Sequence, residues 1–283
     1  MKARPSTVRA LVDLRAPARS EPYGPHLQQR AELHLPAGPG PHPVVVALHG
    51  GFWRARRSRR YMRPLCALLA RHGWAVWNVE YRRVGRGEGG GWPATFADVA
   101  AGIDALSGLD APLDLDRVAA VGHSAGGHLA LWAAARPSLP AGAPGAEPVV
   151  RLSAVAGLAA VSDLEAAPSL CEPGGAVYDL MGTGPADAPD DRYSLANPRR
   201  RLPLGVPIML LHGVLDETVP VRRSRDFAAA ARSAGDEVML VEPAEVGHRR
   251  VVDPRGQAAH SLLEWLEGSR PGRAVDPAGH YAR

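Results

Sequence analysis

The fold is decided by the sequence DRVAAVGHSAGGHLALWA, which occupies residues 116–133. Small apolar residues enter its centre and a run rich in Ala and Leu leaves it, which predicts a strand, a sharp turn and a helix. Ser124 stands at the apex, and the Gly-x-Ser-x-Gly spacing is typical of a nucleophile elbow, where strand and helix nearly touch. Gly122 and Gly126 supply the room that this turn needs. The spacing also occurs by chance in glycine-rich chains, and the flanking strand and helix favour the elbow over an ordinary loop.

The composition fits one large α/β domain or two small ones. The chain has 283 residues, of which 46% are hydrophobic, enough for a sizeable core. Its net charge of +4 comes from 33 Lys and Arg against 29 Asp and Glu, so the charges are mixed and we expect no nucleic-acid partner. The two cysteines, Cys66 and Cys171, belong to no metal-binding motif, and we expect no metal.

The N-terminal segment is where a signal peptide would be expected. Arg and Pro interrupt it before any apolar run long enough for a signal peptide, and no stretch of the sequence approaches a membrane span. We therefore expect a cytoplasmic protein that does not associate with a membrane.

Apolar runs of strand length alternate with helical patterns along most of the chain. Besides the elbow strand, the runs predicted as buried strands are 44–48, 149–161 and 206–213, and 74–79 and 237–241 are predicted as further strands. Such alternation predicts an α/β fold, with a mostly parallel central sheet and helices on both faces. Ligands of such sheets bind beyond the carboxyl ends of the strands.

The remaining segments set the boundaries of the predicted domain. We predict an irregular lead-in over 1–27 and a domain over 28–267, which begins with a half-exposed edge strand. Pro, Gly and Asp are frequent over 163–205 and apolar runs there are short, so we expect a small cap-like insertion that covers the active site. The segment 268–283 shows no periodicity, and we expect it to be disordered.

A second motif follows the first buried strand. The sequence HGGFW, residues 49–53, places Gly50 and Gly51 at the carboxyl end of that strand, where the backbone can approach a ligand closely and direct N–H groups at it. The elbow adds the N–H of Ala125, which lies in the first turn of its helix and so lacks a partner within the helix. These donors predict a binding site for an anion.

A serine nucleophile requires a base, and the base requires a third group that fixes its tautomer. Asp216 and His248 each lie in a loop beyond a predicted core strand. The order Ser124, Asp216, His248 is the chain order of the α/β-hydrolase triad. Glu217 and Asp163 are the alternative acids, and we expect them to be structural or rim residues.

The combined motifs resemble the α/β-hydrolase superfamily, near the small esterases and the kynurenine formamidase (arylformamidase) group. Those enzymes carry an HGGxW strand end, which residues 49–53 match, and a GxSAGxH elbow, which this chain matches with one extra residue, Gly127, before His128. The likeness covers about 28–267 and implies the α/β-hydrolase fold.

The resemblance also implies roles for the strand-end loop. Gly50 and Gly51 would join Ala125 in the oxyanion hole, and His49 would brace the loop that holds them. Phe52 stands where hormone-sensitive-lipase relatives carry another glycine, which points away from that branch.

The activity implied is that of a serine hydrolase for a small carboxylic ester or aryl amide, with N-formylkynurenine as one candidate. Ser124 would attack the carbonyl while His248, held by Asp216, takes the proton, and water would then hydrolyse the acyl-serine. No metal or organic cofactor is required, and we expect a monomer or a homodimer. The alternatives are a prolyl-oligopeptidase-like hydrolase of small peptides and a non-catalytic binding protein. If the chain were a non-catalytic binding protein, we would expect a damaged triad, and the sequence shows no damage to it.

Residues beside these motifs are candidates for contacting the substrate, and His123 is one of them. Phe52 and Trp53 could wall an acyl pocket, or they could pack the loop on the core. An arginine run follows them, at Arg54, Arg56, Arg57, Arg59, Arg60 and Arg63. We favour a solvated helix face for this run over a site for an anionic substrate or a nucleic acid.

Overall fold

A mostly parallel sheet organises residues 18–268, the part of the chain that this computed structural model describes. Its eight strands, in spatial order, are β1 (Arg19–Pro22), β2 (Arg30–His34), β4 (Ala75–Val79), β3 (His42–Leu48), β5 (Leu113–His123), β6 (Ala154–Leu158), β7 (Ile208–Leu211) and β8 (Val238–Val241). β2 is antiparallel to β1 and to β4, and the other neighbouring pairs are parallel. The sheet predicted from the sequence is confirmed.

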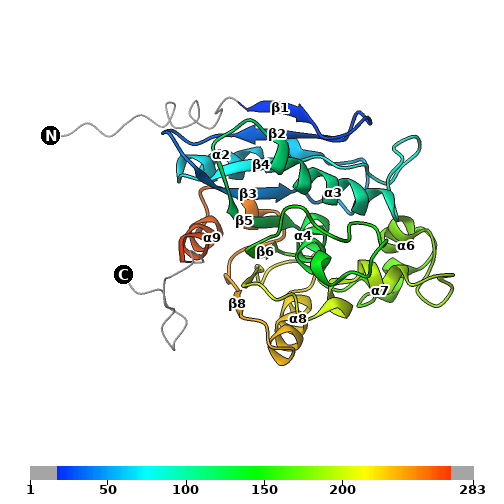
Figure 1. The fold of residues 1–283 in the computed structure, drawn as a ribbon. Helices are drawn as coiled ribbons and strands as arrows, with labels where there is room; N and C mark the ends of the chain where they lie inside the picture. Colours follow the sequence, from blue (N-terminus) through cyan, green and yellow to red (C-terminus); the bar gives the residue numbers. More distant parts are fainter. Residues whose placement is uncertain (1–17, 269–283) are drawn as a thin grey trace.

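Helices cover both faces of this sheet (Figure 1). Successive side chains of a strand point to opposite faces, so Val44 and Val46 enter one hydrophobic core while Val45 and Ala47 enter another. The first core includes α3 (Ala94–Asp104), α4 (Ala125–Ala135) and α8 (Arg222–Ser233), and the second includes α2 (Arg63–Arg71) and α9 (Gln257–Gly268). Because helices cover both faces of the sheet, residues 44–48 of β3 form a continuous run of apolar residues.

The segment predicted as a cap contains three short helices between β6 and β7. They are α5 (Pro168–Cys171), α6 (Ala176–Met181) and α7 (Arg192–Ala196), and Figure 1 shows α6 and α7 together at one end of the sheet. Val177 and Leu180 of α6 are buried in the first core. Short 3₁₀ helices complete the chain at η1 (Arg59–Met62), η2 (Ala105–Gly108), η3 (Arg136–Ser138), η4 (Pro198–Arg201) and η5 (Arg250–Val252).

Predictions for the N-terminal strands are wrong in two respects. The predicted irregular lead-in contains β1, which pairs with β2, so the predicted edge strand is an inner strand. The charged side chain of Glu32 in β2 is also buried. Glu32 accepts hydrogen bonds from Arg63, with Nε of the arginine 3.0 Å from Oε2. The alternation of charged and apolar residues in β2 therefore reflects buried ion pairing and not exposure.

Two other boundaries differ from expectation. Within the predicted strand 149–161, only Ala154–Leu158 forms β6. The predicted disordered tail lies outside the described residues, apart from Gly268 at the end of α9.

Candidate active site

Ser124 occupies the turn between β5 and α4. Its backbone angles are φ 55° and ψ −117°, a conformation that is costly for a residue with a side chain. A Cβ on Gly122 would overlap the Gly126 carbonyl, and a Cβ on Gly126 would overlap the backbone of Leu48. Strand and helix therefore approach so closely that only glycine fits on either side, which is the geometry of a nucleophile elbow.

Asp216 and His248 meet beyond the ends of β7 and β8. Nδ1 of His248 lies 2.7 Å from Oδ2 of Asp216, and Oδ1 of Asp216 accepts the backbone N–H groups of Thr218 and Val219, each at 2.8 Å. Burial raises the pKa of Asp216, but the hydrogen bonds from His212, His248 and Val219 outweigh it and hold the pKa well below its usual range. The carboxylate is thus ionised and fixed by its loop.

A further histidine, His212, supports the same carboxylate from the end of β7. Its Nε2 lies 2.8 Å from the Val219 carbonyl, which can only accept, so Nε2 carries the proton and also reaches Oδ2 of Asp216 at 3.1 Å. Nδ1 then accepts the hydroxyl of Ser224 at 2.7 Å. His212 is completely buried, and the predictions from the sequence gave it no role.

Ser124, His123 and His248 line one cavity of about 460 Å³. Nε2 of His123 donates to the carbonyl of His248 at 2.9 Å, and the two rings lie 4.8 Å apart. Burial, assisted by the neighbouring His248, lowers the pKa of His123 to about 3, so this ring is neutral near pH 7. The structure therefore brings the predicted serine and histidine to one cavity, with Asp216 behind the histidine.

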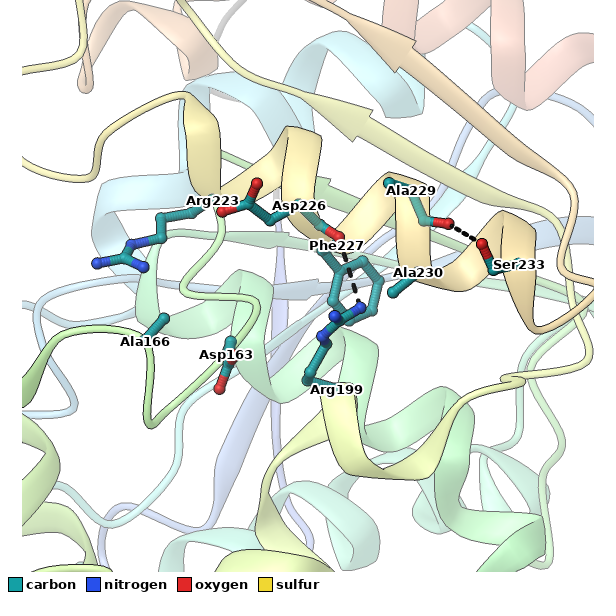
Figure 2. A pocket seen from close by; sticks show the side chains of 9 residues that line it. All are labelled: Asp163, Ala166, Arg199, Arg223, Asp226, Phe227, Ala229, Ala230 and Ser233. Carbon is teal, nitrogen blue, oxygen red and sulfur yellow. Dashed lines mark hydrogen bonds between the residues drawn. The ribbon is translucent and has the colours of Figure 1, made fainter.

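The alternative acids lie elsewhere. Asp163 lines a different cavity, of about 580 Å³, together with Arg199 and residues of α8 (Figure 2). Its Oδ1 accepts the side-chain amide of Asn197 at 2.8 Å, which fits a structural role. Glu217 is exposed. Among the described residues, neither forms a hydrogen bond or an ion pair with His248, whereas Asp216 forms both, so the geometry favours Asp216.

Gly50 and Gly51, the two glycines of the strand-end loop, line the same cavity as Ser124. A Cβ on Gly50 would lie 2.7 Å from the His123 carbonyl and 3.0 Å from Cβ of Ser124, so this backbone packs directly against the elbow. Gly51 has φ 121°, a conformation that favours glycine. Within residues 18–268, the N–H groups of Gly51 and Ala125 have no protein acceptor. They are available to hold an oxyanion.

The loop is braced from behind by β4 and the residues after it. Nε2 of His49 lies 2.7 Å from Oε1 of Glu80, and Tyr81 stacks on the His49 ring at 4.4 Å and donates its hydroxyl to the His49 carbonyl at 2.6 Å. Burial raises the pKa of Glu80, but the bond from His49 and other partners lower it overall. Glu80 and Tyr81 directly follow a buried strand, a signal that could have marked them in the sequence.

Of the predicted substrate contacts, Phe52 and His123 line the cavity, whereas Trp53 does not. Trp53 has φ 57°, is completely buried and packs edge-on against His128 with ring centroids 5.2 Å apart. Its side chain anchors the loop to the core, which was one of the two roles considered for it.

The arginine run is not a uniformly solvated helix face. Arg54 bonds Asp179 of α6, with Nε 3.0 Å from Oδ2, and Arg59 bonds the buried Glu32, with Nε 3.1 Å from Oε1. Arg56 and Arg57 line the 460 Å³ cavity, although a solvated helix face was favoured for their run. Three further lining residues have no counterpart among the predictions from the sequence: they are Tyr61, Thr218 and Arg249. These come from segments distant in sequence, and no local pattern distinguishes them.

The part of the chain that the structure describes contains neither a membrane-spanning helix nor a metal-binding cluster. Within residues 18–268, no helix combines the length and the apolar character needed to cross a bilayer. The same residues contain no group of three or more His, Cys, Asp or Glu placed to hold a metal ion.

Comparison with known sequences gives one family match and two esterase relatives. Residues 32–230 match the family model described as BD-FAE. The chain is 29% identical over 257 residues to the probable carboxylic ester hydrolase LipM of Mycobacterium tuberculosis, covering 83% of this chain and 58% of the relative. It is 30% identical over 237 residues to the esterase LipQ of the same organism, covering 75% and 55%. The chain thus spans little more than half the length of either relative.

Solved structures of esterases share the fold. An esterase from Thermogutta terrifontis, described with bound propionate, superposes with a TM-score of 0.70 at 25% identity, covering 88% of this chain and 92% of that one. A truncated carbohydrate esterase from gut microbiota gives a TM-score of 0.76 at 21% identity, covering 89% and 96%. The α/β-hydrolase fold is thereby confirmed.

Proposed function

Since the chain belongs to the BD-FAE family, we propose that it is a serine carboxylesterase for small esters. One observation carries the proposal: Ser124 on its strained elbow and the Asp216-held His248 line the same cavity. The unpartnered N–H groups of Gly51 and Ala125 complete the set needed for acyl transfer.

The reaction follows from these positions. Nδ1 of His248 is bonded to Asp216, so Nε2 takes the proton of Ser124 as its Oγ attacks the ester carbonyl. The N–H groups of Gly51 and Ala125 stabilise the oxyanion, each typically contributing a factor of about 10² to 10³ in rate. His248 then protonates the leaving alcohol, and water hydrolyses the acyl-serine by the same route.

The substrate is proposed to have a small acyl group. A cavity of about 460 Å³ holds a compact ester. The Thermogutta terrifontis esterase, at 25% identity, is described with bound propionate, a three-carbon acid. An aryl formamide is the second candidate because residues 49–53 match the HGGxW strand end of the kynurenine formamidase group.

Steady-state kinetics on p-nitrophenyl acetate, propionate and butyrate, and on N-formylkynurenine, test the proposal. We expect the short esters to be hydrolysed and Ser124→Ala to reduce turnover by at least about 10³-fold, while Ser107→Ala, at an exposed serine that bonds the Asp104 carbonyl and does not line the cavity, leaves it unchanged. A fluorophosphonate probe should label wild type but not Ser124→Ala. Full ester turnover by Ser124→Ala would refute the mechanism, and a much higher kcat/KM on the formamide would favour the second candidate.

A further inference from the structure

Cationic side chains surround the cavity that holds Ser124 and His248. Arg56 and Arg57 follow the strand-end loop of residues 49–53, which we call the oxyanion loop. Arg249 directly follows His248 in the chain. All three arginines are exposed and line the same cavity, although the two segments are far apart in sequence. The cavity is therefore lined by positive charge both beside the oxyanion loop and beside His248.

These three arginines have no counterion among the residues that the structure describes. Within residues 18–268, none of Arg56, Arg57 and Arg249 forms an ion pair, whereas Arg54 and Arg63 of the same run are paired with Asp179 and Glu32. Asp216 and Glu80 are themselves engaged, since Asp216 bonds His248 and Glu80 bonds His49. Unpaired charges of one sign in a cleft attract ligands of the opposite sign.

Tyr61 adds a polar group at the same place. Its side chain lines the cavity, and its hydroxyl is buried with no hydrogen-bond partner among the described residues. The Arg57 guanidinium lies 5.7 Å from the centre of the Tyr61 ring, a cation–π contact that orients the arginine. Burial raises the pKa of Tyr61, although Arg249 and Arg57 act in the opposite direction, so the hydroxyl keeps its proton and can donate.

The arginines also lie close to the reacting groups. A Cβ on Gly51 would meet Cβ of Arg57 at 2.7 Å, so Arg57 packs directly on the oxyanion loop. Arg249 is joined through the backbone to His248, which protonates the leaving alcohol. An anionic group held between them would lie in the same cavity as Ser124.

We propose that the ester substrate carries a carboxylate, bound by Arg57 and Arg249 with Arg56 at the rim. Guanidinium groups suit this ligand because their fork of donors matches the two carboxylate oxygens. The inference rests on the proposed esterase function and specifies its substrate class. The carboxylate belongs either to the acyl group, as in a dicarboxylic monoester, or to the alcohol part, as in an ester of a hydroxy acid.

Matched pairs of esters distinguish these two sources. For the acyl side, mono-p-nitrophenyl adipate is compared with its neutral methyl ester, and for the alcohol side, 3-acetoxybenzoate is compared with 3-acetoxybenzamide. We expect kcat/KM to be at least about tenfold higher for the anionic member of one pair, mainly through KM. The preference should shrink as the salt concentration rises from 0.05 to 0.5 M, in buffer at about pH 7.

Variants test whether the preference belongs to this site. Arg57→Gln and Arg249→Gln should each lower the ratio of anionic to neutral kcat/KM, and the double variant should lower it further. Arg60→Gln is the control, because Arg60 is an exposed member of the same run that does not line the cavity. An equal fall in Arg60→Gln would overturn the proposal in favour of a diffusely basic surface.

The outcomes separate this inference from the proposed function. Neutral esters cleaved as fast as anionic ones would overturn the carboxylate site and leave the esterase intact. If no ester were cleaved, calorimetry with the Ser124→Ala variant would still compare binding of 3-acetoxybenzoate and 3-acetoxybenzamide. Equal or absent binding of the two there would overturn the carboxylate site, whereas tighter binding of the anion would support it.

Discussion

Nε2 of His123 lies 2.9 Å from the carbonyl oxygen of His248, although the two residues are 125 positions apart in the chain. The residue before the nucleophile thereby holds the backbone of the proposed base, and both rings line the cavity. This contact joins the elbow to the loop after β8.

Replacing His123 tests that tie. We expect His123→Phe to lower kcat about tenfold with little change in KM, because a hydrogen bond of this kind contributes about 0.5–1.5 kcal/mol and its loss lets His248 leave the productive position. Steady-state kinetics on p-nitrophenyl acetate give the result. His123→Gln, which keeps a donor, should retain most of the activity. Wild-type kcat in His123→Phe would show that the tie is dispensable.

The elbow glycines provide a test at the level of folding. We expect Gly126→Ala to destabilise the protein by about 3 kcal/mol or more, because the added Cβ would overlap the backbone of β3. Gly108→Ala is the matched control, since a Cβ there has nothing within 4 Å. Urea unfolding followed by circular dichroism measures both. Equal stability of the two variants would mean that the strand and helix can move apart at no cost.

Part of this site could be predicted because its constraints are local. The elbow needs glycine on both sides of Ser124, and a buried parallel strand needs an unbroken apolar run, so both leave short signatures in the sequence. Asp216 and His248 follow such strands, and the order of the strands in the sheet brings their loops together. The topology thus turns local patterns into a predicted triad.

The rest depends on contacts that no local pattern records. His212 supports Asp216 and Glu80 supports His49 through side chains that meet only in the folded chain. Trp53 directly follows Phe52 and has nearly the same backbone φ, yet Phe52 lines the cavity while Trp53 is completely buried in the core. β1 was missed because four mostly exposed residues carry no apolar signal and gain their order from pairing with β2.

Asp216 should make stability depend on pH. Its folded-state pKa is below its usual value, so it contributes stability above the unfolded pKa of about 3.9, and that contribution is lost as pH falls through the folded value. We expect Asp216→Asn to cost about 2 kcal/mol at pH 7, with the difference from wild type shrinking below about pH 4. Activity should fall about 10³- to 10⁴-fold, because the histidine tautomer is no longer fixed.

Urea unfolding at pH 7, 5 and 3 measures this dependence. Glu217→Gln is the control, because Glu217 is the exposed neighbour of Asp216 and should leave both the stability profile and kcat close to wild type. A stability difference that stays constant from pH 7 to pH 3 would argue against an ionised, hydrogen-bonded Asp216.

The chain of contacts behind Asp216 extends to Ser224 of α8. The Ser224 hydroxyl donates to Nδ1 of His212, which keeps the proton on Nε2, where it serves the Val219 carbonyl and Asp216. Ser224→Ala removes this donor, so His212 can carry its proton on Nδ1 instead of Nε2. Nε2 would then present a lone pair to the Val219 carbonyl and to Oδ2 of Asp216, which is unfavourable. We expect a loss of about 1–2 kcal/mol in stability and a several-fold lower kcat with KM unchanged.

Ser233→Ala gives the matched comparison on the same helix. Ser233 is exposed, and its hydroxyl bonds only the Ala229 carbonyl one turn earlier, so its loss should alter neither stability nor kcat measurably. A second check combines Ser224→Ala with Asp216→Asn. Because the serine acts on catalysis through Asp216, its effect on kcat should vanish in the double variant. Additive effects on kcat would mean that Ser224 acts by another route, such as the packing of α8 on β7.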